Sequence, residues 1–197
     1  METLAQQRRK ASKPLLWIGI GSIIMAFAGL TSGYVVSRTT LVESGNWLVF
    51  ELPTAFNYST VAIIASSLTL WLGKKAISNG EEGRLRLFLW LTIVFGVVFA
   101  VLQVRGWGEL INEQVFFTGP GSNPAGSWVY AISLFHLAHL GGGIISLLYT
   151  TVRAYGGKYS QEDYHGVQLA SIYWHFVDLL WIYLFLFDSY SLDLHES

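Results

Sequence analysis

The sequence predicts an all-α, polytopic membrane protein with five transmembrane helices. Only 13% of its 197 residues are Asp, Glu, Lys or Arg, whereas soluble domains average about 25% charged residues. The chain therefore has too few charges to cover a water-facing surface. Five apolar segments reach the length of about 20 residues that crosses a bilayer. The formal net charge of −1 gives no electrostatic reason to expect nucleic-acid binding.

Each expected span is a long apolar stretch, and the spans cover about residues 15–37, 53–73, 87–106, 127–152 and 167–187. The first contains no charged residue, and the second begins at Pro53, whose missing N–H is harmless in the first turn of a helix. The third carries Gln103 and Arg105 near its end. The fourth carries two histidines, and the fifth carries one histidine and one aspartate. None alternates with a period of two, as strands of a membrane barrel do.

The segments that join the spans are short, and none could hold a separate domain. Residues 118–124, which read TGPGSNP, are typical of a turn. Residues 1–197 are therefore expected to form a single membrane domain.

The basic residues predict the orientation of the chain. Only Arg38 and Arg105 fall on one side of a five-span arrangement, and the other ten fall on the opposite side: Arg8, Arg9, Lys10, Lys13, Lys74, Lys75, Arg84, Arg86, Arg153 and Lys158. Because cytoplasmic loops carry the excess of Lys and Arg, the N-terminus is predicted to be cytoplasmic and the C-terminus external.

Several polar residues fall within the expected spans. Such groups are costly in a membrane unless they are paired, so each is expected to have a partner. At a rise of about 1.5 Å per residue in a core of about 30 Å, His136 and Asp178 share one level. His139 and His175 share the next level inward. We therefore expect the fourth and fifth spans to pack together with these residues and Gln103 in a buried polar network, paired as His136–Asp178 and His139–His175.

Three roles are open for this network. Inward-facing histidines and carboxylates can hold a metal or haem in helix bundles, and chains of His and Asp can relay protons. The interpretation that we favour is a satisfied polar network that fixes the register of the helices. His165, in a water-facing segment, is expected to be an ordinary surface residue. The absence of cysteine excludes disulfides, iron–sulfur clusters, thiolate copper sites and thioether-linked haem in this chain.

Several motifs resemble one family of membrane proteins. Residues 173–181 read YWHFVDLLW, and residues 135–139 read FHLAH. These strings are similar to two successive helices near the end of subunit III of the haem–copper cytochrome c oxidases. The segment from Pro53 to Trp71 resembles another helix of that subunit, and Gln103 matches the glutamine of its Q-x-x-E motif. The resemblance covers about residues 14–190 and identifies the chain as a short, five-helix form of a family that usually has seven spans.

Two positions depart from the family pattern. Ile23 stands where the family often has a buried glutamate, and Gly106 stands at the glutamate of the Q-x-x-E motif. Glu109, three residues further on, is a candidate replacement. Both departures weaken any role of this chain as a proton relay.

The resemblance implies a non-redox subunit of a respiratory terminal oxidase, which reduces dioxygen and translocates protons across the bacterial cytoplasmic membrane. It implies no catalytic residue, metal or haem in this chain, because haem and copper belong to a catalytic subunit I and a copper-bearing subunit II. A small subunit IV and a larger respiratory supercomplex are further implied partners. Bound phospholipid is also implied, with Arg153 matching a family arginine near a lipid headgroup.

Three other functions remain open from the sequence. A subunit III homologue could serve a quinol oxidase or a nitric oxide reductase, because the electron donor binds elsewhere in such complexes. A free-standing transporter or proton channel would need a polar path across the bilayer. A cytochrome b-like protein would use the histidines of the fourth span as haem ligands.

Overall fold

The computed structural model describes residues 4–193 and consists, over that range, of α-helices joined by short loops. The helices are α1 (Leu4–Glu43), α2 (Thr54–Ser78), α3 (Glu82–Asn112), α4 (Pro124–Tyr155) and α5 (His165–Asp193). All five are long and apolar enough to cross a membrane, so the predicted fold class is confirmed. Each helix extends beyond its expected apolar span, because backbone hydrogen bonding continues into the polar ends.

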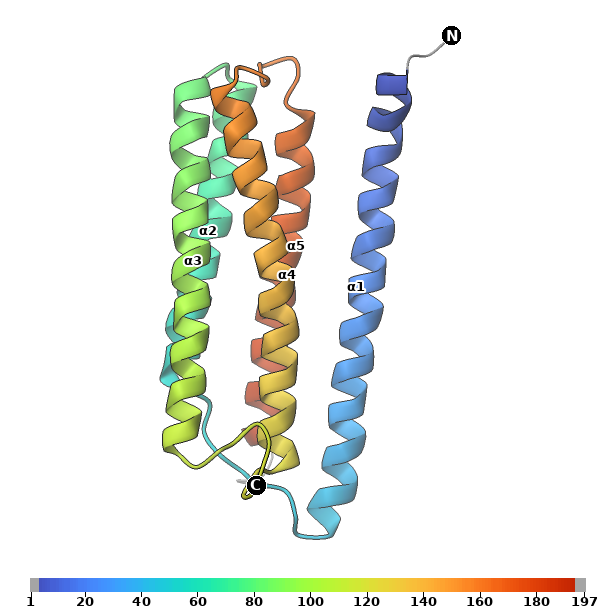
Figure 1. Ribbon diagram of the computed structural model, residues 1–197, viewed down its shortest axis with the longest axis vertical. Coiled ribbons are helices and arrows are strands. Elements are labelled where there is room, and N and C mark those ends of the chain that lie inside the picture. The colour runs from blue at the N-terminus through green and yellow to red at the C-terminus, as the bar shows by residue number, and fades with distance from the viewer. Residues whose placement is uncertain (1–3, 194–197) are drawn as a thin grey trace.

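Helices α2 to α5 form a closed four-helix bundle, and α1 lies outside it (Figure 1). In this ring α3 packs between α2 and α4, and α5 closes it by contacting both α4 and α2. Among the described residues α1 contacts α4 and α5. Successive helices run in opposite directions, so α1 begins at one end of the molecule and α5 ends at the other.

The helix ends follow local sequence signals. Helix α4 begins with Pro124 after Asn123, whose side-chain oxygen accepts a hydrogen bond from the backbone N–H of Ala125, a favoured N-terminal cap. Gly157 adopts a φ of 64° after the end of α4, and the next backbone N–H, of Lys158, returns to the carbonyl of Arg153. This left-handed glycine lets the chain reverse towards α5.

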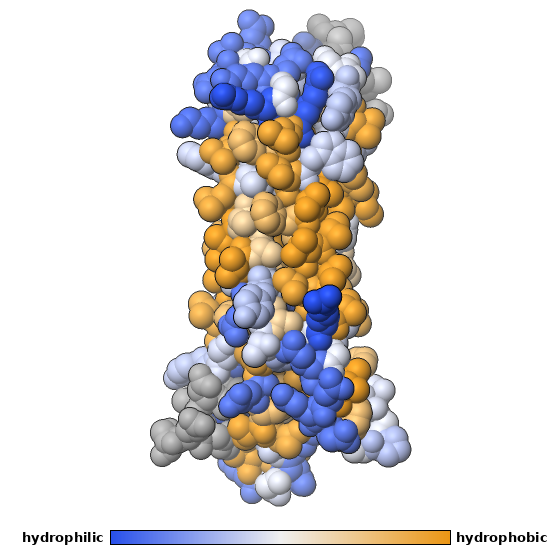
Figure 2. Space-filling model, turned by 90° about the vertical axis from the view of Figure 1, so that its left-hand side faces the viewer, coloured by the Kyte–Doolittle hydropathy of each residue, from blue (hydrophilic) through white to orange (hydrophobic). Residues whose placement is uncertain are grey.

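The outer surface has the pattern of a membrane protein. Apolar side chains cover the middle of the face in Figure 2, and hydrophilic ones gather towards both ends. The start of α1 and the α2–α3 and α4–α5 loops lie at one end of the bundle (Figure 1), which we call the basic end because its residues include Lys13, Lys75, Arg84, Arg86, Arg153 and Lys158. The separation of charges that the sequence predicts is thus present in the fold.

One tryptophan organises the centre of the bundle. Trp174 of α5 is fully buried, and its indole N–H donates to Ser66 of α2 at 3.0 Å. Its ring lies against Gly96 of α3 and Gly143 of α4. A single side chain thus contacts the three other helices of the bundle, and the absence of side chains at the two glycines lets α3 and α4 approach it.

Candidate functional site

His136 is completely buried but does not pair with Asp178. Neither of its ring nitrogens has a hydrogen-bond partner among the described residues. Three aromatic rings surround it instead, with centroid distances of 6.5 Å to Phe27, 5.7 Å to Phe99 and 5.2 Å to Trp181. The predicted His136–Asp178 pair is therefore wrong.

His139 and His175 also have other partners. The Nδ1 atom of His139 lies 2.7 Å from the carbonyl oxygen of Phe135, one turn earlier in α4. The Nδ1 atom of His175 lies 2.6 Å from the hydroxyl of Ser67 on α2. The predicted His139–His175 pair is wrong as well, and α5 directs its histidine towards α2 rather than α4.

The error comes from rotation about the helix axis. Helices α4 and α5 do pack together, but a shared depth brings two side chains together only if both face the same interface. At 3.6 residues per turn, Trp174 and Trp181 lie on one face of α5 and occupy the core. His175 and Asp178 lie on the adjacent face and point towards α2, where they line a groove with Ser67.

Asp178 is therefore left short of hydrogen-bond donors among the described residues. Only 3% of its surface is exposed, and neither carboxyl oxygen has a hydrogen bond of good geometry. The hydroxyl of Ser67 interacts with this carboxyl group, but it also contacts Nδ1 of His175. The polar residues expected to form one network are thus divided among separate places in the fold.

Gln103 forms its own small polar contact. Its side chain is fully buried, and its amide donates to the hydroxyl of Ser59 at 2.8 Å. This bond joins α3 to α2, while the side-chain carbonyl of Gln103 finds no partner in the described part of the chain. Gln103 is thus buried, but it does not belong to a network with the histidines.

The motif departure at Gly106 has a structural explanation. Gly106 packs directly on the ring of Phe56, so that a side chain at this position would clash with the ring. Glu109 instead reaches the start of α2, where its carboxylate accepts hydrogen bonds of 3.3 Å from the hydroxyl of Thr54 and from the backbone N–H of Ala55. Pro53, at the N-cap position, provides no side-chain cap, so Glu109 supplies the missing acceptor from another helix.

A second buried carboxylate escaped the sequence analysis. Asp188 of α5 is only 4% exposed, and one of its oxygens has no hydrogen-bond partner among the described residues. It lies near Tyr34, which is also close to Arg38 of α1. Asp188 falls just beyond the expected end of the fifth span, about 15 Å from Asp178 along the helix axis, so the sequence by itself indicates an interfacial residue.

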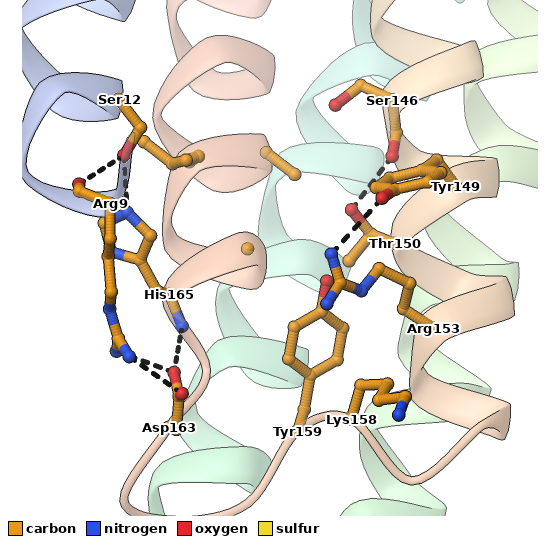
Figure 3. A pocket seen from close by; sticks show the side chains of 13 residues that line it. Arg9, Ser12, Ser146, Tyr149, Thr150, Arg153, Lys158, Tyr159, Asp163 and His165 are labelled. Atoms are coloured by element: carbon orange, nitrogen blue, oxygen red, sulfur yellow. Dashed lines mark hydrogen bonds and ion pairs between the residues drawn. The ribbon is translucent and has the colours of Figure 1, made fainter. Parts of the chain in front are cut away.

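Arg153 lies in a pocket of about 710 Å³ at the basic end, between α1, α4 and the start of α5 (Figure 3). Its guanidinium donates to the hydroxyl of Tyr149 at 3.2 Å. Lys158 lines the same pocket. Across it, Arg9 pairs with Asp163 through two hydrogen bonds of 2.9 and 2.7 Å. Three basic side chains and one carboxylate therefore leave the pocket with a formal charge of +2 when His165 is neutral.

His165 is part of this pocket and not an isolated surface residue. Its Nε2 atom lies 2.7 Å from the hydroxyl of Ser12 on α1. Its backbone N–H donates to Asp163. This contact and the carboxylate's ion pair with Arg9 outweigh the opposing effect of burial and lower the pKa of Asp163. The pocket thus connects α1 to the α4–α5 loop, a connection that spacing along the sequence does not reveal.

Comparisons with known proteins identify the family. The sequence pattern of "Cytochrome c oxidase subunit III" matches residues 46–191. The chain is 32% identical over 176 residues to a probable cytochrome c oxidase subunit 3 of Nocardia farcinica, covering 87% of this chain and 82% of that protein. It is 29% identical over 192 residues to the cytochrome c oxidase subunit 3 of Corynebacterium diphtheriae, covering 92% of both chains. A pattern that covers nearly all of the α2–α5 bundle, together with relatives of similar length, shows that this chain belongs to the cytochrome c oxidase subunit III family.

Proposed function

We propose that this chain is the non-redox subunit III of a respiratory haem–copper terminal oxidase in a bacterial cytoplasmic membrane. The observation that carries the proposal is the family match over residues 46–191. In such a complex a catalytic subunit I and a copper-bearing subunit II hold the redox centres and reduce dioxygen. This chain supports the catalytic subunit structurally and through bound lipid, with its basic end in the cytoplasm.

The surroundings of the histidines support a role without a cofactor. The ring of His136 is completely buried and packs against Phe27, Phe99 and Trp181, which does not favour the approach of a haem iron to either ring nitrogen. His139 is engaged with the backbone of its own helix. His136 has no hydrogen-bond partner among the described residues, so it does not continue a polar path, which favours a structural role over that of a proton channel.

The basic pocket is the part of the molecule that we assign to a phospholipid headgroup. Its formal charge of +2 attracts a phosphate, and the guanidinium of Arg153 keeps donors that its contact with Tyr149 does not use. The pocket lies at the membrane–water boundary, where headgroups reside, because it occupies the ends of α1 and α4. Acyl chains can continue from it along the apolar surface of α4.

The subunit role is tested by purification of the tagged chain from its native membrane in mild detergent. We expect haem–copper subunits to co-purify, together with a small subunit IV or a larger supercomplex where these form. Oxygen uptake by the purified complex should be supported by reduced cytochrome c. Uptake supported by quinol alone would assign the complex to a quinol oxidase, and absence of any haem-bearing partner would contradict the proposal.

The lipid role is tested by Arg153→Gln, with Arg84→Gln as the matched control. Both arginines lie at the basic end, but Arg84 pairs with Glu81 on the surface and does not line the pocket. Native mass spectrometry of the complex should show loss of one bound anionic phospholipid in Arg153→Gln only. Equal lipid content in both variants would contradict the assignment of the pocket.

A further inference from the structure

We propose that the groove between α2 and α5 receives a transmembrane helix of another subunit, and that this helix presents a hydrogen-bond donor to Asp178. The polar floor of the groove consists of Ser67, His175 and Asp178, and its walls include Ile64, Leu68 and Leu179. The proposal rests on the proposed function, because it requires the chain to be one subunit of a complex.

The shortage of donors around Asp178 is the first observation. Its carboxyl group is almost completely buried and lines the groove, and neither of its oxygens has a hydrogen bond of good geometry among the described residues. The hydroxyl of Ser67 interacts with this carboxyl group, but it also lies 2.6 Å from Nδ1 of His175 and has a single hydrogen to donate. A buried carboxyl group that lacks donors is costly in a medium that contains no water. The fold of this chain thus leaves one strong acceptor open to a donor from outside.

The depth of Asp178 identifies the source of that donor. It lies 13 residues after His165 and 15 before Asp193, which places it about 20 Å from either end of α5. Lipid headgroups remain at the interface, and acyl chains carry no donors. A side chain on another membrane helix is the chemical group that can reach this level, and hydrogen bonds between side chains commonly join such helices.

The walls of the groove fit the same occupant. The groove measures about 580 Å³, and its apolar walls are open, with Leu68 59% and Leu179 67% exposed. The partner helix would fill this groove with apolar side chains. Between them, one Ser, Thr, Asn, Gln, Trp or Arg would donate a hydrogen bond to the carboxyl group of Asp178. Asp188, the other buried carboxylate of α5, lies near Tyr34 of this chain and does not line the groove.

A photoactivatable phenylalanine analogue encoded in place of Leu179 tests the occupant in the intact, purified complex. The matched control places the same group at Val98, an exposed residue of α3, the helix diagonally opposite α5 in the bundle. We expect Leu179 to yield one cross-linked partner chain at several times the yield from Val98. A cross-link to lipid alone, to a second copy of this chain, or at the yield of Val98 would overturn the proposal.

The donor is tested by Asp178→Leu and Asp178→Asn in the same complex. Loss of one interhelical hydrogen bond should weaken retention of the partner by roughly 3- to 30-fold in Asp178→Leu. Asp178→Asn keeps an acceptor and should retain the partner better. The isolated chain should be no less stable with Asp178→Leu, because a buried acceptor that lacks donors has been removed. This measurement separates failure to fold from failure to bind.

These outcomes are distinct from failure of the proposed function. A chain that co-purifies with haem–copper subunits but does not cross-link through Leu179 refutes the docking site alone. Unchanged partner retention in Asp178→Leu also refutes it. Absence of haem–copper subunits from the preparation refutes the function itself.

Discussion

Replacement of Gly96 by alanine should destabilise the protein through a single side chain, Trp174. A Cβ atom at Gly96 would lie 2.7 Å from Cη2 and 3.0 Å from Cζ2 of the Trp174 ring. Carbon atoms normally approach to about 3.5–4.0 Å, so the ring would have to move by about 0.8 Å. The hydrogen bond of 3.0 Å from its Nε1 to Ser66 opposes that movement.

The opposite side of the ring leaves no space for it to move. A Cβ atom at Gly143 would lie only 3.0 Å from Cε3 of Trp174, so the indole is already close to α4. Overpacking of a filled core costs about 1–3 kcal/mol. Because alanine also has a higher helix propensity than glycine by about 1 kcal/mol, the effect must be measured against a glycine that has open space.

Gly141 is that control. It lies two residues from Gly143 in the same helix, and a Cβ atom there would meet nothing within 4 Å. Both alanine variants gain the same propensity, so the difference between them isolates the clash. We expect Gly96→Ala to unfold more easily than Gly141→Ala by about 1–3 kcal/mol, measured by SDS titration in mixed micelles.

A double-mutant cycle tests the cause of this difference. Trp174→Phe removes Cη2 and Cζ2 from the ring and therefore removes the clashing atoms. The combined Gly96→Ala and Trp174→Phe variant should be more stable than the sum of the two single effects predicts. Additive effects, or equal stability of Gly96→Ala and Gly141→Ala, would refute the reasoning.

Three further predictions concern polar contacts. Glu109→Gln keeps an acceptor at the start of α2, whereas Glu109→Ala leaves that end uncapped and should cost about 0.5–2 kcal/mol in the same SDS titration. Ser59→Ala should destabilise the chain by about 1 kcal/mol because it leaves the amide of Gln103 unpaired, while Gln103→Leu should cost less because it also removes an unpaired carbonyl. The Arg9–Asp163 pair is exposed and should contribute at most about 1 kcal/mol. Since the pKa of Asp163 is lowered in the fold, this contribution is present above the ordinary Asp pKa and is lost as the pH falls through the lowered value. Spin-label distances between α1 and the α4–α5 loop should then increase, and an unchanged distance at low pH would contradict the role of the pair.

The absence of cysteine makes the chain well suited to these measurements. Cysteine pairs can be introduced for labelling without first removing native thiols. A pair of labelled cysteines, one in α1 and one in the α4–α5 loop, measures the distance across the basic pocket. This distance therefore separates loss of the Arg9–Asp163 pair from unfolding of the bundle.

The polar residues of α4 and α5 join different helices from those that their depth predicts. A single network of His136, His139, His175 and Asp178 would have fixed the register of α4 against α5. In the fold, His136 is held by aromatic rings, and the contact between α5 and α2 involves His175 and Ser67. Asp178 therefore contributes little to the packing of α5 within this chain. Its buried carboxyl group lacks donors here, and a partner helix could supply one.

The sequence by itself determined the membrane class, the five helices, the grouping of basic residues at one end and the family. These properties follow from composition, from apolar length and from a local motif such as YWHFVDLLW, all of which are fixed along one helix. Depth is also a property of one helix, and for that reason the levels of His136 and Asp178 could be calculated before their surroundings were known.

Only the tertiary structure decided which face of each helix meets which neighbour. Rotation about the helix axis depends on how side chains from several helices fill the same space, and Trp174 between Gly96 and Gly143 sets it for α5. That packing turns Asp178 towards α2, joins Glu109 to the start of α2 and gathers Arg9, Arg153 and Lys158 around one pocket. Each of these contacts links residues far apart in the chain, and no local pattern specifies them.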